Sequence, residues 1–203
     1  MNHSNQNRVG SIEFEAKFLD IDHQALRQRL TELGATCEVP VRLMRRVNLD
    51  FADKRLDRQR AWARLRDEGT GTVTLTLKHR KGEGVDGIHE TETTVGNYDG
   101  ALGFLQGIGL EVKSYQETRR ESWRFGEIQI ELDEWPWLPP LVEVEGPDEA
   151  SVRKTAALLG LDWEHAGFGP INQAYLDRYR ATNEDINYLP AYRFDDPAPW
   201  PVR

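Results

Sequence analysis

The sequence is poor in cysteine, in histidine and in long apolar runs, and each shortage excludes a class of protein. Cys37 is the single cysteine among 203 residues, so no disulfide can form within the chain and a reducing compartment is expected. The five histidines show no spacing typical of zinc ligands. No stretch approaches the ~20 apolar residues of a membrane span, and the polar start, MNHSNQNRVG, has no apolar signal core. We therefore expect a cytoplasmic protein that crosses no membrane.

Excess positive charge is also missing. The chain carries 34 acidic and 26 basic residues, for a formal net charge of −8. A field of that sign disfavours non-specific binding to nucleic acid or to an anionic membrane. It does not exclude a local basic site.

The stretch IEFEAKF, residues 12–18, introduces the pattern that is abundant. Glu13, Glu15 and Lys17 alternate with apolar residues, which predicts a strand with one charged face. Carboxylates two residues apart on a strand lie roughly 6.6–7 Å from one another and repel by about 2 kcal/mol at an effective dielectric near 20. A strand at the surface relaxes that repulsion in water, so this stretch alone indicates a solvated sheet face.

Seven later segments repeat the pattern of strands with a polar or charged side. They are residues 44–51, 62–69, 72–80, 88–95, 117–125, 127–135 and 141–146. Amphipathic helices are predicted over 20–34, 99–108 and 148–159, each followed or closed by a glycine, with a fourth over 171–180. The sequence thus predicts an α+β domain over residues 1–180, followed by an extended tail over 181–203.

Eight such strands would form a barrel with the charged faces inside. Sheets bury their apolar face, and the helices and tail can cover that face from outside. The lumen of an eight-stranded barrel is wide enough for one small ligand. The carboxylates that would face it are Glu13, Glu15, Glu90, Glu92, Glu131, Asp133, Glu143 and Glu145. The cations are Lys17, Arg46, Arg64, Arg66, Lys78, Arg80 and Arg119.

The side-chain types indicate the ligand. Carboxylates without histidine or cysteine suit Mg²⁺, Mn²⁺ or Ca²⁺ rather than zinc. Paired Arg and Lys match phosphate oxygens, and a polyphosphate bridged to carboxylates by a divalent metal satisfies both sets. The alternative is a solvated sheet on which, for example, Arg64 and Arg66 pair with Asp67 or Glu68.

Several motifs, in order, resemble the CYTH domain, the family of triphosphate tunnel metalloenzymes. EFEAK resembles its Glu-x-Glu-x-Lys signature, and ARLR, TLTLK, ETE, TRRESW, ELDEW and VEVEG resemble its later strands across roughly residues 11–146. INQAYLDRY resembles its C-terminal segment with a tyrosine. The resemblance implies an eight-stranded antiparallel barrel that forms a tunnel.

Roles follow from the resemblance residue by residue. It implies that Mg²⁺ or Mn²⁺ is held by Glu13, Glu15, Asp133, Glu143 and Glu145, to which the inward position of Glu131 adds a sixth carboxylate. It implies that triphosphate is bound by Lys17, Arg64, Arg66, Lys78 and Arg119, with Arg46 and Arg80 added from their strand faces. Lys17, Glu90 and Glu92 are the expected catalytic residues.

Two positions depart from the family pattern. Ile88 and Glu117 stand where many members carry an arginine and a lysine, which lowers the positive charge of the tunnel. Arg80 is expected to compensate, whereas Arg120 is not, because alternation from Arg119 places it on the opposite strand face.

Three functions stay open at this point. The first is metal-dependent hydrolysis of a triphosphate, such as tripolyphosphate, thiamine triphosphate or a nucleoside triphosphate. The second is adenylyl cyclase, which forms cyclic AMP and pyrophosphate from ATP. The third is a binding module for polyphosphate or nucleotide without turnover. The expected partner is a small-molecule triphosphate, with no membrane and no nucleic acid, and a homodimer is an open arrangement.

Overall fold

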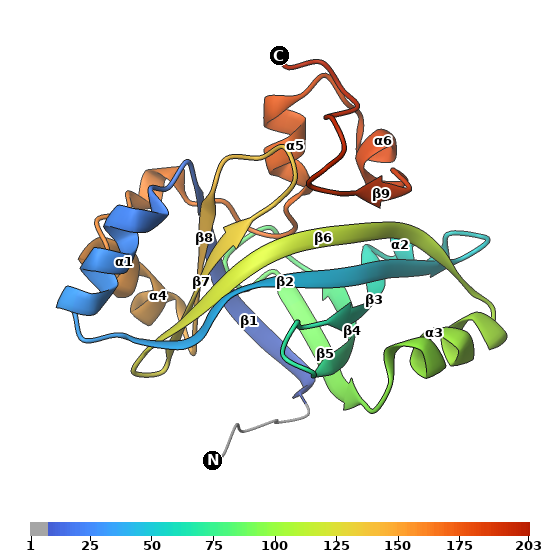
Figure 1. Ribbon diagram of the computed structural model, residues 1–203, viewed down its shortest axis with the longest axis horizontal. Helices are drawn as coiled ribbons and strands as arrows, with labels where there is room; N and C mark the ends of the chain where they lie inside the picture. Colours follow the sequence, from blue (N-terminus) through green and yellow to red (C-terminus); the bar gives the residue numbers. More distant parts are fainter. Residues whose placement is uncertain (1–7) are drawn as a thin grey trace.

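The eight expected strands form a closed antiparallel barrel. The computed structural model describes residues 8–203, with the backbone alone for residues 8–11 and 13. The strands follow the order β2-β3-β4-β5-β1-β8-β7-β6, and pairing between β2 and β6 closes the ring (Figure 1). Their bounds are β1 Arg8–Leu19, β2 Thr36–Phe51, β3 Ala61–Asp67, β4 Val73–Arg80, β5 Ile88–Val95, β6 Leu110–Phe125, β7 Ile128–Glu134 and β8 Leu141–Gly146. The fold class predicted from the sequence is confirmed.

Two strands are longer than the sequence pattern predicts. β2 and β6 have 16 residues each and pair along most of their length. β2 contains Pro40, which lies within the register irregularity between Val39 and Arg42. Because proline cannot donate to a strand ladder, it sits where the pairing is interrupted. Because of this proline, the sequence pattern did not predict the first half of β2.

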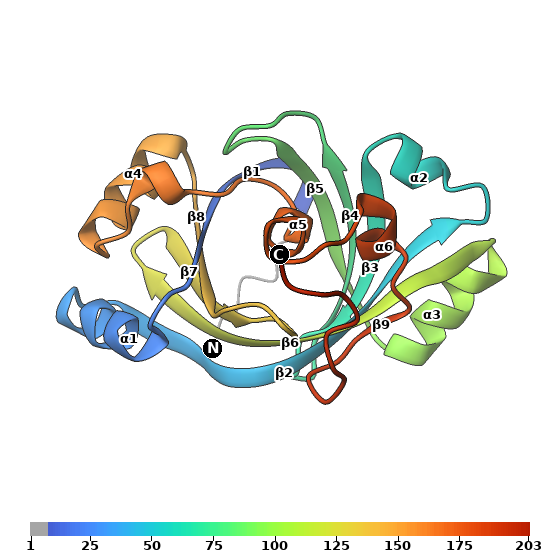
Figure 2. The same cartoon turned by 90° about the horizontal axis from the view of Figure 1, so that it is seen from above.

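Helices cover the outer face of the barrel. The helices α1 (His23–Glu32), α3 (Tyr98–Gly107) and α4 (Glu149–Leu158) lie where they were predicted, and Figure 2 shows α1 and α4 together on one flank, with α3 on the other. Side-chain oxygens of Asp22, Asn97 and Asp148 accept hydrogen bonds from the first-turn N–H groups of these three helices. These N-caps explain where each helix begins.

The hydrophobic core lies outside the barrel, beneath these helices. Ile130, Leu132, Val142 and Val144 on β7 and β8 are at most 2% exposed and pack with Leu30 of α1 and its neighbours. A second cluster lies between α3 and strands β2 and β3. Since successive strand residues point to opposite faces, an outward apolar set directs the alternate charged residues into the lumen.

The C-terminal segment lies across one end of the barrel. It contains α5 (Asn172–Arg178), α6 (Asn183–Asn187) and the short strand β9 (Ala191–Tyr192), and α5 lies over the ring of strands in Figure 2. Residues 181–203, predicted to be an extended tail, therefore include a helix and a strand that runs parallel to β6. The helix was missed because it has only five residues, too few to show a helical period.

Aromatic side chains attach this C-terminal cap, defined here as residues 167–203, to the barrel. Tyr175, Tyr179 and Tyr192 are buried with Trp135, which follows β7. The Tyr175 hydroxyl donates a hydrogen bond of 2.9 Å to the Pro136 carbonyl. At the start of the cap, Gly167 exchanges two backbone hydrogen bonds with Lys17 of β1. The cap is thus fixed to the barrel wall at both places.

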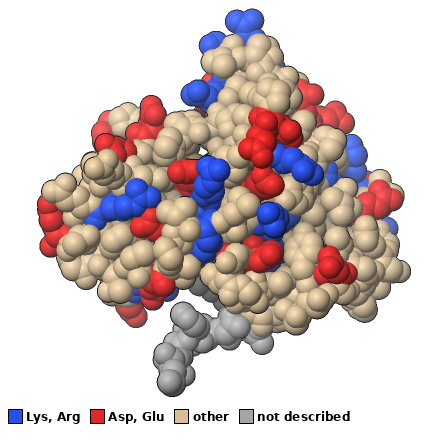
Figure 3. All heavy atoms as spheres, viewed as in Figure 1, with Lys and Arg blue, Asp and Glu red and all other residues tan. Residues whose placement is uncertain are grey.

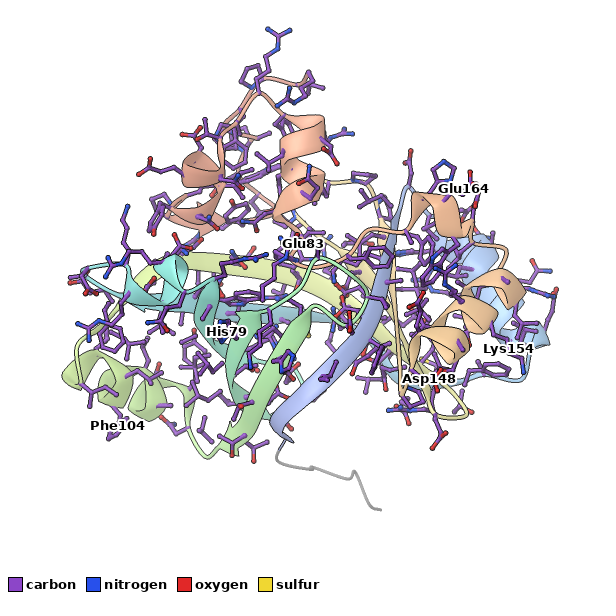
Figure 4. The ribbon with its side chains drawn as sticks, turned by 180° about the vertical axis from the view of Figure 1, so that it is seen from behind. His79, Glu83, Phe104, Asp148, Lys154 and Glu164 are labelled. Atoms are coloured by element: carbon purple, nitrogen blue, oxygen red, sulfur yellow. The ribbon has the colours of Figure 1, made fainter. Side chains whose placement is uncertain are left out.

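Surface charge is mixed in sign. On the face drawn in Figure 3, basic and acidic side chains are interspersed and no large patch of one sign forms. Phe104 on α3 points away from the barrel in Figure 4 and is 67% exposed. Within the described part of the chain, no helix has the length and apolar character that crossing a bilayer requires.

Candidate functional site

The barrel encloses a cavity of about 610 Å³ lined mainly by charged side chains. Its lining includes twelve of the residues predicted from the sequence: Glu15, Lys17, Arg46, Arg64, Arg66, Lys78, Arg80, Glu90, Glu92, Glu131, Glu143 and Glu145. Together these side chains line one cavity and not a solvated sheet face, although the pairing of Arg66 with Glu68 that the alternative includes is present, with 2.6 Å between Nε and Oε1. The structure also places the C-terminal cap in contact with the same space.

One wall of the cavity is acidic and is built by β1, β8 and β7. Glu15 lies directly opposite Glu145 in the ladder between β1 and β8, and Glu131 lies opposite Glu143 between β7 and β8. Like charges at opposed antiparallel positions have Cβ atoms only ~5 Å apart and destabilise the pairing. This acidic wall therefore requires cations among its carboxylates.

Lys17 and Arg120 supply positive charge to the acidic wall. Lys17 pairs with Glu15, and its Nζ lies 3.4 Å from Glu143 Oε1. Arg120 Nε donates to Asp133 Oδ1 at 2.6 Å, and its Nη2 donates to Glu143 Oε2 at 2.6 Å. Burial disfavours the charged form of Glu143, but Lys17 and Arg120 outweigh it and hold the pKa of Glu143 well below its usual range.

Glu131 behaves differently from its neighbour on β8. Burial raises the pKa of Glu131 from 4.5 to about 7, and nearby Arg120 offsets only part of this rise. Its Oε2 has no hydrogen-bond partner within the described residues and lies 3.9 Å from Arg120 Nε. Glu131 thus presents a buried oxygen without a hydrogen-bond donor at the acidic wall.

The opposite wall, on β3, β4 and β5, pairs cations with carboxylates. Lys78 Nζ lies 2.9 Å from Glu90 Oε2, and Arg64 Nη2 lies 3.9 Å from the same oxygen. Arg64 also approaches Glu92, with 3.5 Å between Nη2 and Oε2. Burial lowers the pKa of Arg64, and the nearby charge of Arg66 lowers it further.

Arg46 of β2 carries positive charge without a matching carboxylate among the described side chains. It is 5% exposed, its Nη2 donates to Thr118 Oγ1 at 2.6 Å, and its guanidinium lies 4.6 Å from the ring centre of Trp135. Burial lowers the pKa of Arg46 strongly, and Arg66 and Arg64 lower it further. An anion in the cavity would relieve this repulsion among arginines.

Arg119 was predicted at the site, and this prediction is wrong. The side chain lies outside the barrel, 47% exposed, with Nη1 3.1 Å from Glu134 Oε2. Arg120 faces the cavity instead. Trp123 explains the orientation: it is buried in the core beneath α1 and α4, so residues 121 and 119, two and four positions earlier, share its outward face. The large apolar side chain of Trp123 could have indicated from the sequence that Arg119 points outward.

The structure places Asp133, Glu13 and the two positions that depart from the family pattern as follows. Asp133 is fully buried and holds Arg120, so it lies behind the lining rather than in it. The side chain of Glu13 lies outside the described residues. Ile88 lines the cavity, whereas Glu117 points outward and accepts a hydrogen bond from the Tyr115 hydroxyl. Only the departure at Ile88 therefore bears on the charge of the cavity.

Sequence reasoning missed several polar residues that line the cavity, among them Asn48, Gln116, Asn172 and Asn187. Neutral amides carry no signal of their own in a sequence. For Asn48 and Gln116, strand parity with Arg46 and Arg120 would have indicated an inward position. The two cap residues depend on the long-range docking of α5 and α6.

The donor set fits a hard divalent cation in chemistry. The acidic wall offers only carboxylate oxygens, and one of these, Glu131 Oε2, is buried without a hydrogen-bond donor among the described residues. As the described side chains lie, however, no three His, Cys, Asp or Glu residues converge on one point. Lys17 and Arg120 occupy the space between the carboxylates, so cation binding would require these two side chains to move.

Solved structures share this fold. A putative adenylate cyclase from Vibrio parahaemolyticus aligns with a TM-score of 0.72 at 18% identity, covering 83% of this chain and 99% of that one. A protein from Pyrococcus horikoshii aligns at 0.65 and 19%, covering 80% and 99%. A putative adenylyl cyclase from Hippeastrum, described as having a dominant triphosphatase activity, aligns at 0.60 and 17%, covering 81% and 96%. At such identities the likeness shows the fold alone.

Sequence comparison identifies the family. No curated protein matches the chain significantly. The sequence profile of the CYTH domain, in contrast, matches residues 11–162, which form the barrel except the first three residues of β1, together with α1, α3 and α4. The strand motifs noted in the sequence lie within this span, INQAYLDRY lies beyond it, and the match covers well over half of the chain. The chain belongs to the CYTH domain family.

Proposed function

We propose that this protein hydrolyses the terminal phosphoanhydride bond of a small-molecule triphosphate, with a divalent cation such as Mg²⁺ or Mn²⁺, in a cytoplasmic setting. The observation that carries the proposal is that a wall of carboxylates and a group of arginines and lysines line one cavity. Divalent-metal dependence is general in the CYTH family, and its members are triphosphatases or adenylyl cyclases, which supports the proposal.

The arginines would bind and orient the triphosphate. Arg46 and Arg64 are buried, and neighbouring arginines lower the pKa of both, so phosphate oxygens are favourable partners for them. A guanidinium can donate two parallel hydrogen bonds to a phosphate, and this geometry fixes the chain of phosphates. In the barrel these contacts would also stabilise charge on the nonbridging oxygens as the bond breaks.

The carboxylates would divide their roles by position. Glu15, Glu131, Glu143 and Glu145 on the acidic wall would hold the cation, which would neutralise phosphate charge and help to orient the attacking water. Glu90 and Glu92 lie on the opposite wall, where Glu90 is 4% exposed and pairs with Lys78. We assign these two glutamates to positioning the water and accepting its proton.

Adenylyl cyclase is the second candidate. The fold is shared with a Vibrio protein named as a putative adenylate cyclase, and the cavity volume lies within the ~300–1,000 Å³ typical of sites for drug-sized ligands. In that reaction the ribose 3′ oxygen would attack the α-phosphate and pyrophosphate would leave. The two reactions differ in products and are therefore separable in one assay.

The test is a product panel with purified protein and Mg²⁺ or Mn²⁺. Tripolyphosphate, thiamine triphosphate and ATP would be offered separately, and orthophosphate, pyrophosphate and cyclic AMP would be measured. We expect orthophosphate and no cyclic AMP. Formation of cyclic AMP and pyrophosphate from ATP would show that the protein is an adenylyl cyclase and not a triphosphatase. Tight binding of triphosphate without any product would show that it is a binding module.

A further inference from the structure

Neutral amides line the cavity where the barrel wall meets the C-terminal cap. Asn48 of β2 and Gln116 of β6 come from the barrel wall, and Asn172 of α5 and Asn187 of α6 come from the C-terminal cap. Lys113 and Asp57 also line the cavity and neutralise one another, with 3.2 Å between Nζ and Oδ1. This amide end, defined by the four amide residues, differs in chemistry from the two charged walls.

The amide end adjoins the arginines. In the strand ladders Asn48 lies directly opposite Arg64, and Gln116 lies directly opposite Arg46. A molecule whose phosphates rest on these arginines would therefore place its next group beside the amides. The cavity of about 610 Å³ is large enough for such a group.

The amides have hydrogen-bonding capacity to offer. Asn48 Oδ1 is buried and has no hydrogen-bond partner among the described residues. Asn172 Nδ2 donates to Asn187 Oδ1 at 2.7 Å, which orients both amides and uses one donor and one acceptor of the pair. Each carboxamide has two donors and an acceptor oxygen, so further donors and an acceptor stay available for a bound molecule.

We propose that the amide end is a specificity site that binds the neutral organic group of a nucleoside triphosphate. Amides both donate and accept, which matches the hydroxyls of a sugar and the edges of a heterocyclic base. Phosphate would instead select arginine and lysine, and a cationic group would select carboxylates. The inference rests on the proposed function and narrows its substrate class.

The cap residues of this site belong to the part of the chain beyond the CYTH match. The match ends at residue 162, whereas α5 and α6 span 172–187. The cap is held in place by the buried hydroxyl of Tyr175 and by backbone pairing at Lys17. The amide end therefore combines residues of the barrel wall with residues of the C-terminal cap.

The test compares ATP with tripolyphosphate in variants of the amide end. The double variant Asn172→Ala/Asn187→Ala removes both members of the hydrogen-bonded pair, so neither is left without its partner. Gln116→Ala tests the barrel side. Gln106→Ala, on the exposed surface of α3, is the matched control. Steady-state KM would be measured for both substrates, and binding of the non-hydrolysable imido analogue of ATP would be measured by calorimetry.

We expect KM for ATP and the dissociation constant of the analogue to rise about tenfold in the double variant and in Gln116→Ala, as loss of a hydrogen bond of about 1.4 kcal/mol gives. KM for tripolyphosphate should stay within about twofold, because these amides would not contact its phosphates. Gln106→Ala should leave all values unchanged. If the double variant does not fold, Gln116→Ala decides the question.

Two results would overturn the inference: equal loss for both substrates, or no loss for either. Its failure is distinguishable from failure of the proposed function. If the wild type hydrolyses tripolyphosphate but neither binds nor hydrolyses ATP, the proposed hydrolysis stands and the specificity site is wrong. If the protein hydrolyses neither substrate, the proposed function is wrong. The calorimetric comparison of the variants would still test the amide end.

Discussion

Arg120 is a buried cation that pairs with carboxylates of the acidic wall. It is held by Asp133 and Glu143, with Glu131 at 3.9 Å. Burial disfavours its charge, but Asp133 and Glu143 outweigh burial and raise the pKa of Arg120. A buried charge in this position is strongly coupled to its partners, so the effect of removing it is large.

The first prediction compares Arg120→Ala with Arg119→Ala. Removal of Arg120 leaves buried carboxylates without their cation, and we expect the free energy of unfolding to fall by ~3–5 kcal/mol. Arg119 is nearly half exposed, so its loss should cost no more than ~1 kcal/mol. Urea denaturation of both variants measures the difference. Equal effects would contradict the placement of these two side chains.

The second prediction concerns Glu131 and pH. Because the pKa of Glu131 is about 7 in the folded protein against 4.5 ordinarily, the folded state holds this proton more tightly. Stability should therefore fall as pH rises from about 4.5 to about 7, by up to ~3 kcal/mol from this group. Glu131→Gln, which stays neutral, should lack that part of the fall.

The measurement is urea unfolding at pH 5 and pH 8, in chelator, for the wild type and for Glu131→Gln. Other groups titrate in both proteins, so the difference between the two isolates Glu131. The same change with pH in both proteins would show that the carboxyl of Glu131 ionises normally.

The types of residue in the cavity were predictable from strand alternation. Which of two neighbouring residues points inward was not always predictable. Glu15, Lys17, Arg64 and Lys78 lie on strands with a clear apolar face and were placed correctly in the lumen. The segment around Arg119 has polar residues on both faces, and only the burial of a single tryptophan fixes its direction. Alternation fails as a guide where neither face is apolar.

At the scale of elements, strands and long helices were predictable because each has a period of its own. The helices α1, α3 and α4 carry an N-cap and an apolar stripe, both local signals. The elements α2 (Arg55–Arg58), α6 and β9 were not predicted. The two helices are shorter than two helical turns, and the strand is too short to show an alternating pattern. Their structure depends on contacts with distant segments, such as β6 beside β9.

The third prediction tests how the C-terminal cap is attached. Tyr175→Phe removes the hydroxyl that donates to the Pro136 carbonyl and leaves a buried acceptor unsatisfied. We expect the free energy of unfolding to fall by ~1–2 kcal/mol. Tyr98→Phe on α3 is the matched control, since the hydroxyl of this half-buried ring makes no hydrogen bond to a backbone carbonyl among the residues that the structure describes. If both variants lose the same stability, the hydroxyl of Tyr175 does not anchor the cap.

For the molecule as a whole, the barrel separates a mixed outer surface from a charged interior. The net charge of −8 would repel a polyphosphate in free solution, whereas the arginines of the cavity would attract it at short range. The sequence predicted this interior from the repeated charged faces. It did not predict that α5 and α6 would line the cavity, because that docking depends on aromatic packing between distant segments.

The most direct test of the central claim is calorimetric titration of tripolyphosphate with and without Mg²⁺, in the wild type and in Glu15→Gln/Glu145→Gln. If one cavity holds both cation and triphosphate, Mg²⁺ should tighten tripolyphosphate binding to the wild type at least tenfold. The double variant should lose that gain but keep the weaker metal-independent binding through its arginines. An unchanged Mg²⁺ effect in the variant, or no tripolyphosphate binding by the wild type, would contradict the account.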